Sequence, residues 1–110
     1  MITVIICSHN PNIEFLNRAI DALKIQTLPK NDWELLLVDN ASKNPLREIY
    51  NLSWHPRGRH VHEANLGLTQ ARLRGISEAE GSALIFVDDD NVLAPNYLES
   101  ALNISKSHSF

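Results

Sequence analysis

The sequence is short of cysteine and of long apolar runs, and each shortage excludes a class of protein. Cys7 is the only cysteine among 110 residues, so no internal disulfide can form, and such a chain suits a reducing compartment. The apolar run at residues 1–6 has no charged segment before it and stops at Cys7, so it is too short for a signal peptide or a membrane span. We therefore expect a cytoplasmic protein, at most peripheral at a membrane in a full-length form.

A basic excess is also missing. The chain has 10 Lys and Arg residues against 13 Asp and Glu residues, with a formal net charge of -3. Proteins that bind nucleic acid present a positively charged surface, so we expect no nucleic-acid partner. Hydrophobic residues make up 44% of the chain, which is enough for one core, and we expect a single domain over residues 1–110.

Glycine is missing from the turn that follows the first apolar segment. That turn contains Ser8, His9, Asn10 and Pro11, whereas the four glycines stand at positions 58, 67, 75 and 81. A dinucleotide or a P-loop phosphate requires glycines in this turn, because they let the backbone approach the phosphates closely. The sequence therefore argues against a dinucleotide-binding Rossmann domain and against a P-loop.

The chain does contain short apolar segments that alternate with segments of helical length. We predict strands over residues 3–8, 34–39, 60–63 and 83–87. Three of them are continuously apolar, which is typical of a parallel sheet covered by helices on both faces. Because crossover connections are right-handed, we expect a Rossmann-like α/β fold with about four parallel strands in the order 3-2-1-4.

Four helices are predicted between and after these strands. The first carries Leu16, Ile20 and Leu23 at helical spacing, with Asn10 as its N-cap and Pro11 in its first position. The others are expected over residues 44–51, over residues 68–81 and from residue 95 onward.

The third of these helices contains a glycine in its interior. Gly75 there is less favourable than alanine by about 1 kcal/mol. We therefore expect that this helix packs unusually close to the sheet, which would compensate for the glycine.

Polar residues follow three of the predicted strands. Asp88, Asp89 and Asp90 come directly after residues 83–87, residues 8–10 end the first strand, and Asp39 ends the second. The carboxyl ends of parallel strands meet at one edge of a sheet, where ligands bind. Three adjacent carboxylates repel one another unless a cation or hydrogen-bond donors compensate, and oxygen ligands suit Mg²⁺ or Mn²⁺. The sequence therefore predicts a divalent metal site at this edge.

In this order the segments resemble the nucleotide-binding half of a GT-A glycosyltransferase of the large inverting family 2. The resemblance rests on residues 4–10, 36–42, 65–72 and 85–95, which together span nearly the whole chain. It implies a glycosyltransferase that binds a nucleotide-diphosphate sugar, such as a UDP-sugar, with Mg²⁺ or Mn²⁺ as cofactor.

The resemblance also implies roles for single residues on the donor side. Ser8, His9 and Asn10 would lie along the nucleotide, Asp39 would hydrogen-bond the base, and Arg72 would lie near the nucleotide.

Further roles are implied by the loop before the third helix and by the acidic triplet. Asn65 lies in a loop that approaches the donor in this family. Asp88 to Asp90 match the D-x-D signature, in which Asp88 faces the ribose and Asp90 ligates the cation that bridges the diphosphate. We count both Asp88 and Asp90 as metal residues, and Asp89, the middle position, with the donor-binding residues.

The family transfers the sugar by an inverting displacement in which a carboxylate base deprotonates the acceptor hydroxyl. That base lies well after the D-x-D signature, so we expect it beyond Phe110, together with the site for a saccharide or lipid-linked acceptor. We therefore expect donor binding without transfer from these 110 residues. Because the family's sheet continues past its fourth strand, we also expect an exposed sheet edge through which copies of the chain can associate.

Two other functions fit the same residues. A non-catalytic Rossmann-like module for assembly or regulation would respond to no nucleotide with metal. A metal-dependent nucleotidyltransferase would prefer free nucleoside triphosphates to nucleotide-sugars.

Overall fold

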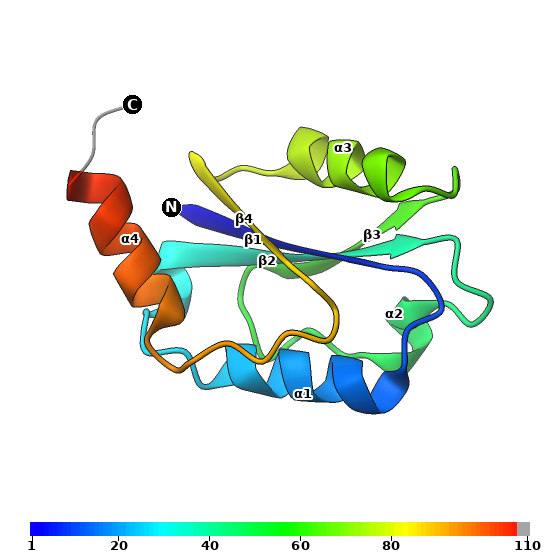
Figure 1. Cartoon of the computed structure of the whole chain (residues 1–110), viewed down its shortest axis with the longest axis horizontal. Coiled ribbons are helices and arrows are strands. Elements are labelled where there is room, and N and C mark those ends of the chain that lie inside the picture. Colours follow the sequence, from blue (N-terminus) through cyan, green and yellow to red (C-terminus); the bar gives the residue numbers. More distant parts are fainter. Residues whose placement is uncertain (108–110) are drawn as a thin grey trace.

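The computed structural model describes residues 1–107 and has a four-stranded sheet with helices on both of its faces (Figure 1). The elements follow one another in this order: β1 (Ile2–Ser8), α1 (Ile13–Lys24), the 3₁₀ turn η1 (Lys30–Asp32), β2 (Trp33–Asn40), α2 (Leu46–Ile49), β3 (Gly58–Glu63), α3 (Leu68–Glu78), β4 (Ala83–Val87) and α4 (Tyr97–Ser107).

The strands are parallel and lie in the order β3-β2-β1-β4, which confirms the predicted topology. In this register, Ile5 of β1 stands opposite Leu36 of β2 and opposite Phe86 of β4. The predicted strands lie within the observed ones. β1, β2 and β3 each begin one or two residues earlier than predicted, and β4 has the predicted bounds.

Most of the core lies between the sheet and the helices α1, α2 and α4. Alternate residues of β1 and β2 point to this face, and Leu16, Ile20 and Leu23 of α1 pack against them, as their spacing predicted. The opposite face carries a smaller buried cluster of Ile5, Leu36, Val38, Val61 and Ala71. Figure 1 shows α3 alone above the sheet, with α1 and α2 below it.

Gly75 lets α3 approach the sheet closely, which confirms the expectation for this residue. A Cβ atom at position 75 would lie 2.7 Å from Cγ2 of Ile5 and 3.6 Å from Cγ2 of Val38. Ala71 and Gly75 are the buried residues of α3, whereas Ile76 is 45% exposed. Ile76 follows Gly75 directly, but the narrow contact made by small residues excludes it from the packed face.

The start of α1 differs from the prediction. Asn12 is its N-cap and accepts a hydrogen bond from Phe15 N at 3.2 Å, so the helix begins two residues later than Pro11 suggested. Asn10 has a φ of 44°, a left-handed conformation that asparagine tolerates better than most residues. Its side-chain oxygen accepts from Lys43 N at 2.7 Å, and this contact takes Asn10 away from the helix.

β4 is not covered on both faces, contrary to the prediction from its apolar sequence. Leu84 is 38% exposed and Phe86 is 41% exposed, whereas Val87 is buried. The reason is the position of α3, which packs chiefly on β1, β2 and β3. β4 is also an edge strand, because within residues 1–107 it pairs with β1 only.

Two tryptophans cover the sheet near the start of β2. Trp33 is fully buried, and Trp54 packs against the same cluster. His55, 2% exposed, packs against both rings, with its ring centroid 4.3 Å from that of Trp33 and 5.6 Å from that of Trp54. Its Nδ1 accepts a hydrogen bond from Arg57 N at 2.9 Å. Burial, with smaller contributions from the positive charges of Lys30 and Arg57, lowers the pKa of His55 from 6.5 to about 4.

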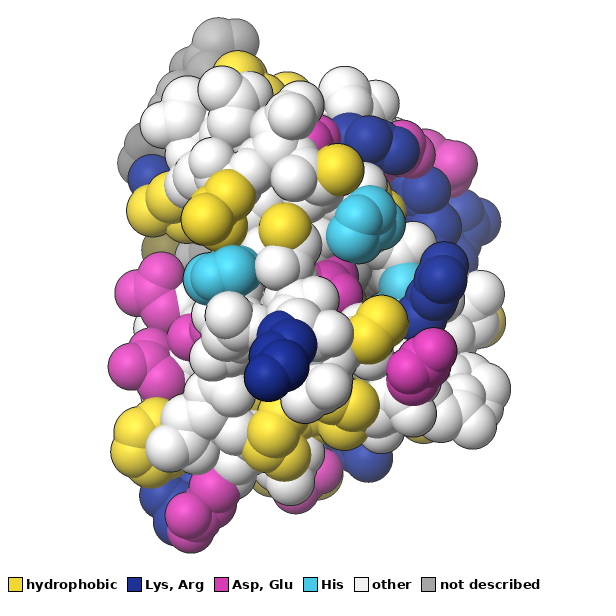
Figure 2. Space-filling view, turned by 90° about the vertical axis from the view of Figure 1, so that its right-hand side faces the viewer, with side chains coloured by type: hydrophobic (Ala, Val, Ile, Leu, Met, Phe, Trp, Pro, Cys, Tyr) yellow, Lys and Arg dark blue, Asp and Glu magenta, His cyan; other side chains and the backbone are white. Residues whose placement is uncertain are grey.

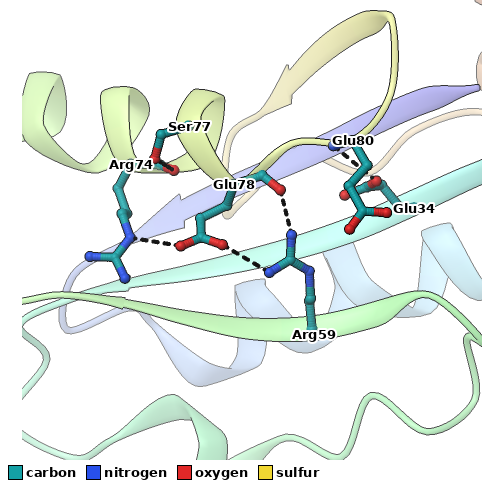
Figure 3. A network of polar contacts seen from close by, with 6 residues as sticks. All are labelled: Glu34, Arg59, Arg74, Ser77, Glu78 and Glu80. Carbon is teal, nitrogen blue, oxygen red and sulfur yellow. Dashed lines mark hydrogen bonds and ion pairs between the residues drawn. The ribbon is translucent and has the colours of Figure 1, made fainter.

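A polar network fastens the end of α3 to the sheet (Figure 3). Glu78 accepts hydrogen bonds from Arg59 at 3.0 Å and Arg74 at 3.2 Å, and these bonds hold the pKa of Glu78 below its ordinary value. Glu34, 2% exposed, accepts from Glu80 N at 3.2 Å, and burial raises the pKa of Glu34. The network lies toward the amino ends of the strands, away from the predicted site.

No helix within residues 1–107 has the length and apolar composition needed to cross a membrane.

Candidate functional site

The carboxyl ends of the four parallel strands bring the predicted polar residues to one side of the molecule. The strands end at Ser8, Asn40, Glu63 and Val87, and the loops that follow them lie along this edge. Figure 2 looks onto this side and shows one group of acidic side chains along one margin, while basic side chains, with other acidic ones among them, lie mainly toward the opposite margin. Ligands of open α/β sheets bind at such an edge.

The acidic triplet forms a tight turn directly after β4. Asn91 N donates to Asp88 O at 3.0 Å, which closes the turn around Asp89 and Asp90. Asp88 and Asp90 are exposed, whereas Asp89 is half-buried. Ser8 Oγ donates to Asp89 Oδ2 at 2.7 Å. The carboxylate of Asp89 is therefore bonded within the protein, whereas the carboxylates of Asp88 and Asp90 face outward.

Asp39 has a structural task that the sequence did not reveal. Its Oδ1 accepts from Ser42 N at 3.1 Å and its Oδ2 from Leu46 N at 3.0 Å, at the start of α2. Burial by itself would raise the pKa of Asp39, but the hydrogen bonds from Ser42 and Leu46 more than offset this and lower it. Each carboxylate oxygen thus already holds a backbone donor and keeps only its remaining lone pair for a ligand.

Asn40 was not assigned a role from the sequence, yet it organises the loop between β3 and α3. Its side chain is 3% exposed. Nδ2 donates to Glu63 O at 3.1 Å and to Asn65 O at 2.9 Å, while Oδ1 accepts from Gly67 N at 2.9 Å. Asn65 N in turn donates to Glu63 Oε2 at 2.9 Å. The sequence did hold a signal for this role, since Asn40 follows Asp39 at the end of a strand. Consecutive residues point to opposite faces of a sheet, so the Asn40 side chain points to the face opposite that of Asp39.

His9 and Asn10 link the ends of β1 and β2. His9 Nδ1 lies 2.6 Å from Asn40 O, and His9 Nε2 lies 3.1 Å from Nδ2 of Asn10. Because a carbonyl oxygen only accepts, we assign the proton to Nδ1 and an acceptor role to Nε2. Asn10 N donates to Ser42 Oγ at 3.0 Å. Both side chains therefore shape the site and are held by neighbours.

A cavity of about 240 Å³ opens between these loops and the start of α3. Its lining residues are Cys7, Ser8, His9, Asn40, Leu66, Gly67, Leu68 and Ala71. Burial raises the pKa of the Cys7 thiol to about 11, with a smaller opposing effect of the Arg72 charge. Cys7 is therefore a neutral, partly buried side chain at neutral pH and offers no thiolate nucleophile.

Arg72 lies close enough to this cavity for its positive charge to act on Cys7. Its guanidinium carbon lies 5.8 Å from the ring centroid of Phe86, within the range of a cation–π contact. Phe86 thus supports an exposed arginine on the α3 side of the sheet, close to Cys7. The position suits a residue that attracts a negatively charged ligand.

The donor set of the acidic turn fits a hard divalent cation that completes its coordination with other oxygens. Asp88 and Asp90 offer exposed carboxylates that form no ion pair within residues 1–107. Mg²⁺ is commonly held by one or two carboxylates together with waters and substrate phosphates. Within the same residues, no group of three or more His, Cys, Asp or Glu side chains is placed to hold a metal.

The sequence and the fold both match known proteins. The sequence model of the family described as "Glycosyl transferase family 2" matches residues 3–109. An uncharacterized glycosyltransferase of Rickettsia felis is 29% identical over 110 residues, which cover 99% of this chain and 18% of that protein.

Two solved structures share the fold. TarS of S. aureus in complex with UDP superposes with a TM-score of 0.86 and 22% identity over 97% of this chain and 32% of that chain. PcManGT, a mannosyltransferase from Pyrobaculum calidifontis in complex with GDP-Man and Mn²⁺, gives a TM-score of 0.80 and 22% identity over 92% of this chain and 31% of that chain. This chain thus spans about a fifth of the Rickettsia protein and about a third of each solved chain.

Proposed function

This chain belongs to glycosyl transferase family 2, and we propose that it forms the nucleotide-sugar-binding part of a metal-dependent, inverting glycosyltransferase. The observation that carries the proposal is the turn after β4. It holds Asp88 and Asp90 outward at the carboxyl edge of the sheet, next to the end of β1. The solved structures with UDP and with GDP-Man and Mn²⁺ support a nucleotide-sugar as the donor.

We propose that the donor lies along the carboxyl edge, with its nucleobase between Asp39 and the cavity of about 240 Å³ and its diphosphate toward the acidic turn. The cavity offers apolar walls for a planar ring, and the backbone around it is held by Asn40. Arg72 lies near enough to attract the phosphates. The residues that we propose for contact with the donor are Ser8, His9, Asn10, Asp39, Asn65, Arg72 and Asp88. Asp89, which the sequence placed with them, bonds Ser8 instead.

The chemistry explains why carboxylates stand next to the proposed diphosphate. Breaking the bond between sugar and phosphate leaves a nucleoside diphosphate with additional negative charge. A divalent cation, Mg²⁺ or Mn²⁺, stabilises that charge when it is bound. Asp88 and Asp90 are the residues that would hold it, while Asp39 and Asn40 keep the surrounding loops in place.

The catalytic base and the acceptor site also belong to the proposal, but they lie outside this chain's 110 residues. We propose that the carboxylate that deprotonates the acceptor hydroxyl lies beyond Phe110, in sequence outside the described residues. The relatives are several times longer than this chain, which leaves room for this base and for a saccharide or lipid-linked acceptor.

Isothermal titration of the chain with UDP, with and without Mn²⁺, tests the proposal. We expect binding that Mn²⁺ strengthens, and we expect Asp90→Ala to remove this strengthening, a loss of at least about tenfold in affinity. Asp32→Asn is the matched control, because it removes one exposed carboxylate at the opposite end of β2.

The same titration separates the alternatives. Tighter binding of a free nucleoside triphosphate than of a UDP-sugar would favour a nucleotidyltransferase. A folded chain that binds no nucleotide with either metal would favour a non-catalytic module and end the proposal.

A further inference from the structure

The three aspartates after β4 have different surroundings, although they are adjacent in sequence. Asp88 and Asp90 are exposed, and Asp89 is half-buried. Asp89 is also the member of the triplet whose carboxylate accepts a hydrogen bond from another strand, through Ser8 Oγ at 2.7 Å. Residues 8 and 89 are 81 positions apart in the sequence, so this bond joins two distant segments.

The bond lies where the backbone pairing of β1 and β4 stops. The last paired residues are Ile6 and Val87, while β1 continues to Ser8. Continuing the register by two residues brings Ser8 opposite Asp89, where the turn from Asp88 to Asn91 has already left the sheet. The side-chain bond therefore replaces the missing backbone bonds and holds the turn against β1.

Ser8, the hydrogen-bond donor, is well placed to hold the turn. Ser8 is 3% exposed and lies in the middle of the sheet, between β2 and β4. It pairs with Asp39 in the β1–β2 register, so its backbone is fixed on the other side as well. The bond length of 2.7 Å is the usual one for a hydroxyl donor and an oxygen acceptor.

We propose that Asp89 is a positioning residue: by accepting the hydrogen bond of Ser8, it fixes the turn so that Asp88 and Asp90 face a bound cation together. This inference rests on the proposed metal-dependent binding of a nucleotide-sugar. It gives the middle residue of the acidic triplet a defined task, and it requires only the acceptor oxygen of Asp89, not its charge.

Two substitutions of Asp89 separate these two properties in a titration with UDP in the presence of Mn²⁺. We expect Asp89→Asn, which keeps an acceptor oxygen for Ser8, to bind within about threefold of the unmodified chain. Asp89→Ala and Ser8→Ala both lose the bond, and we expect each to weaken Mn²⁺-dependent UDP binding by about tenfold. Asp32→Asn again serves as the control for the loss of a carboxylate.

A double-mutant cycle tests whether both residues act through one bond. We expect Ser8→Ala combined with Asp89→Ala to bind no more weakly than the poorer single variant, because the second change removes a partner that is already lost. The same cycle, measured as urea denaturation without metal or nucleotide, should show coupling between the two positions.

Three results would overturn the inference. Asp89→Ala could bind like the unmodified chain, Asp89→Asn could be as weak as Asp89→Ala, or the effects of Ser8→Ala and Asp89→Ala could multiply. Failure of the proposed function is distinguishable, because then the unmodified, folded chain binds no UDP with Mn²⁺, and both ideas fall at that control.

Discussion

Replacement of Asn40 by alanine should destabilise the protein far more than the replacement of a polar residue on the surface. Three hydrogen bonds of the side chain are lost, to Glu63 O, Asn65 O and Gly67 N. Each such bond contributes about 1 kcal/mol net, and a buried partner that stays unpaired adds a penalty of about 1–3 kcal/mol. Water can reach part of this loop, because Asn65 is exposed. We therefore expect Asn40→Ala to lower the free energy of unfolding by about 2–4 kcal/mol.

Urea denaturation followed by tryptophan fluorescence measures this loss, since Trp33 and Trp54 belong to the main core. Hydrogen exchange gives a local reading as well. Gly67 N donates to Asn40 Oδ1, so its amide should exchange much faster in Asn40→Ala.

Asn65→Ala is the matched control for this experiment. It removes the same kind of side chain from the loop that Asn40 holds, but the hydrogen bonds at this position come from the backbone N and O of Asn65. We expect a change within about 0.5 kcal/mol. The reasoning is refuted if Asn40→Ala and Asn65→Ala have equal stability and Gly67 stays protected in both.

Three further predictions concern packing, pH and association. Gly75→Ala should lower stability by about 1–2 kcal/mol despite the better helix propensity of alanine, because the new Cβ meets Ile5 at 2.7 Å. Denaturation in an Ile5→Leu background, which lacks the obstructing methyl group, should show a smaller loss, and a stabilising Gly75→Ala would contradict the packing argument. His55 has a folded-state pKa of about 4 against 6.5 ordinarily, so its contribution is present above pH 6.5 and is lost as pH falls from 6.5 to 4, by about 2–3 kcal/mol. His55→Gln should flatten that part of the stability curve, and parallel curves for the two proteins would count against it. If copies pair through the edge of β4, sedimentation should show a concentration-dependent dimer that Leu84→Lys abolishes, and a monomer at all concentrations would reject that pairing.

Much of the architecture followed from the sequence because it depends on local pattern and on general rules of chain connection. Continuous apolar segments such as 35–38 are typical of buried strands, and right-handed crossovers leave few orders for them. The polar residues at strand ends then had to meet at one edge, as Ser8 and Asp89 do. The matching family was apparent for the same reason, since its motifs are the strand ends themselves.

Other features depend on which partner a side chain finds across the fold, and no local pattern reports that choice. Asn10 resembled an N-cap, but Lys43 and Ser42 compete for it, and Asn12 caps α1. β4 resembled a strand covered on both faces, but α3 lies over its neighbours and leaves Phe86 exposed.

The sequence by itself determined the order of the sheet, the acidic edge and the family, because hydrophobic periodicity and chain connectivity are properties of consecutive residues. Only the tertiary structure decided which residues at that edge hold the backbone and which face a ligand. Asp39 and Asn40 hold loops, Asp89 bonds Ser8, and Asp88 and Asp90 remain free to face a ligand. The physical reason is that a hydrogen bond requires a partner within about 3 Å in the right direction, and for these residues that partner comes from a distant part of the chain.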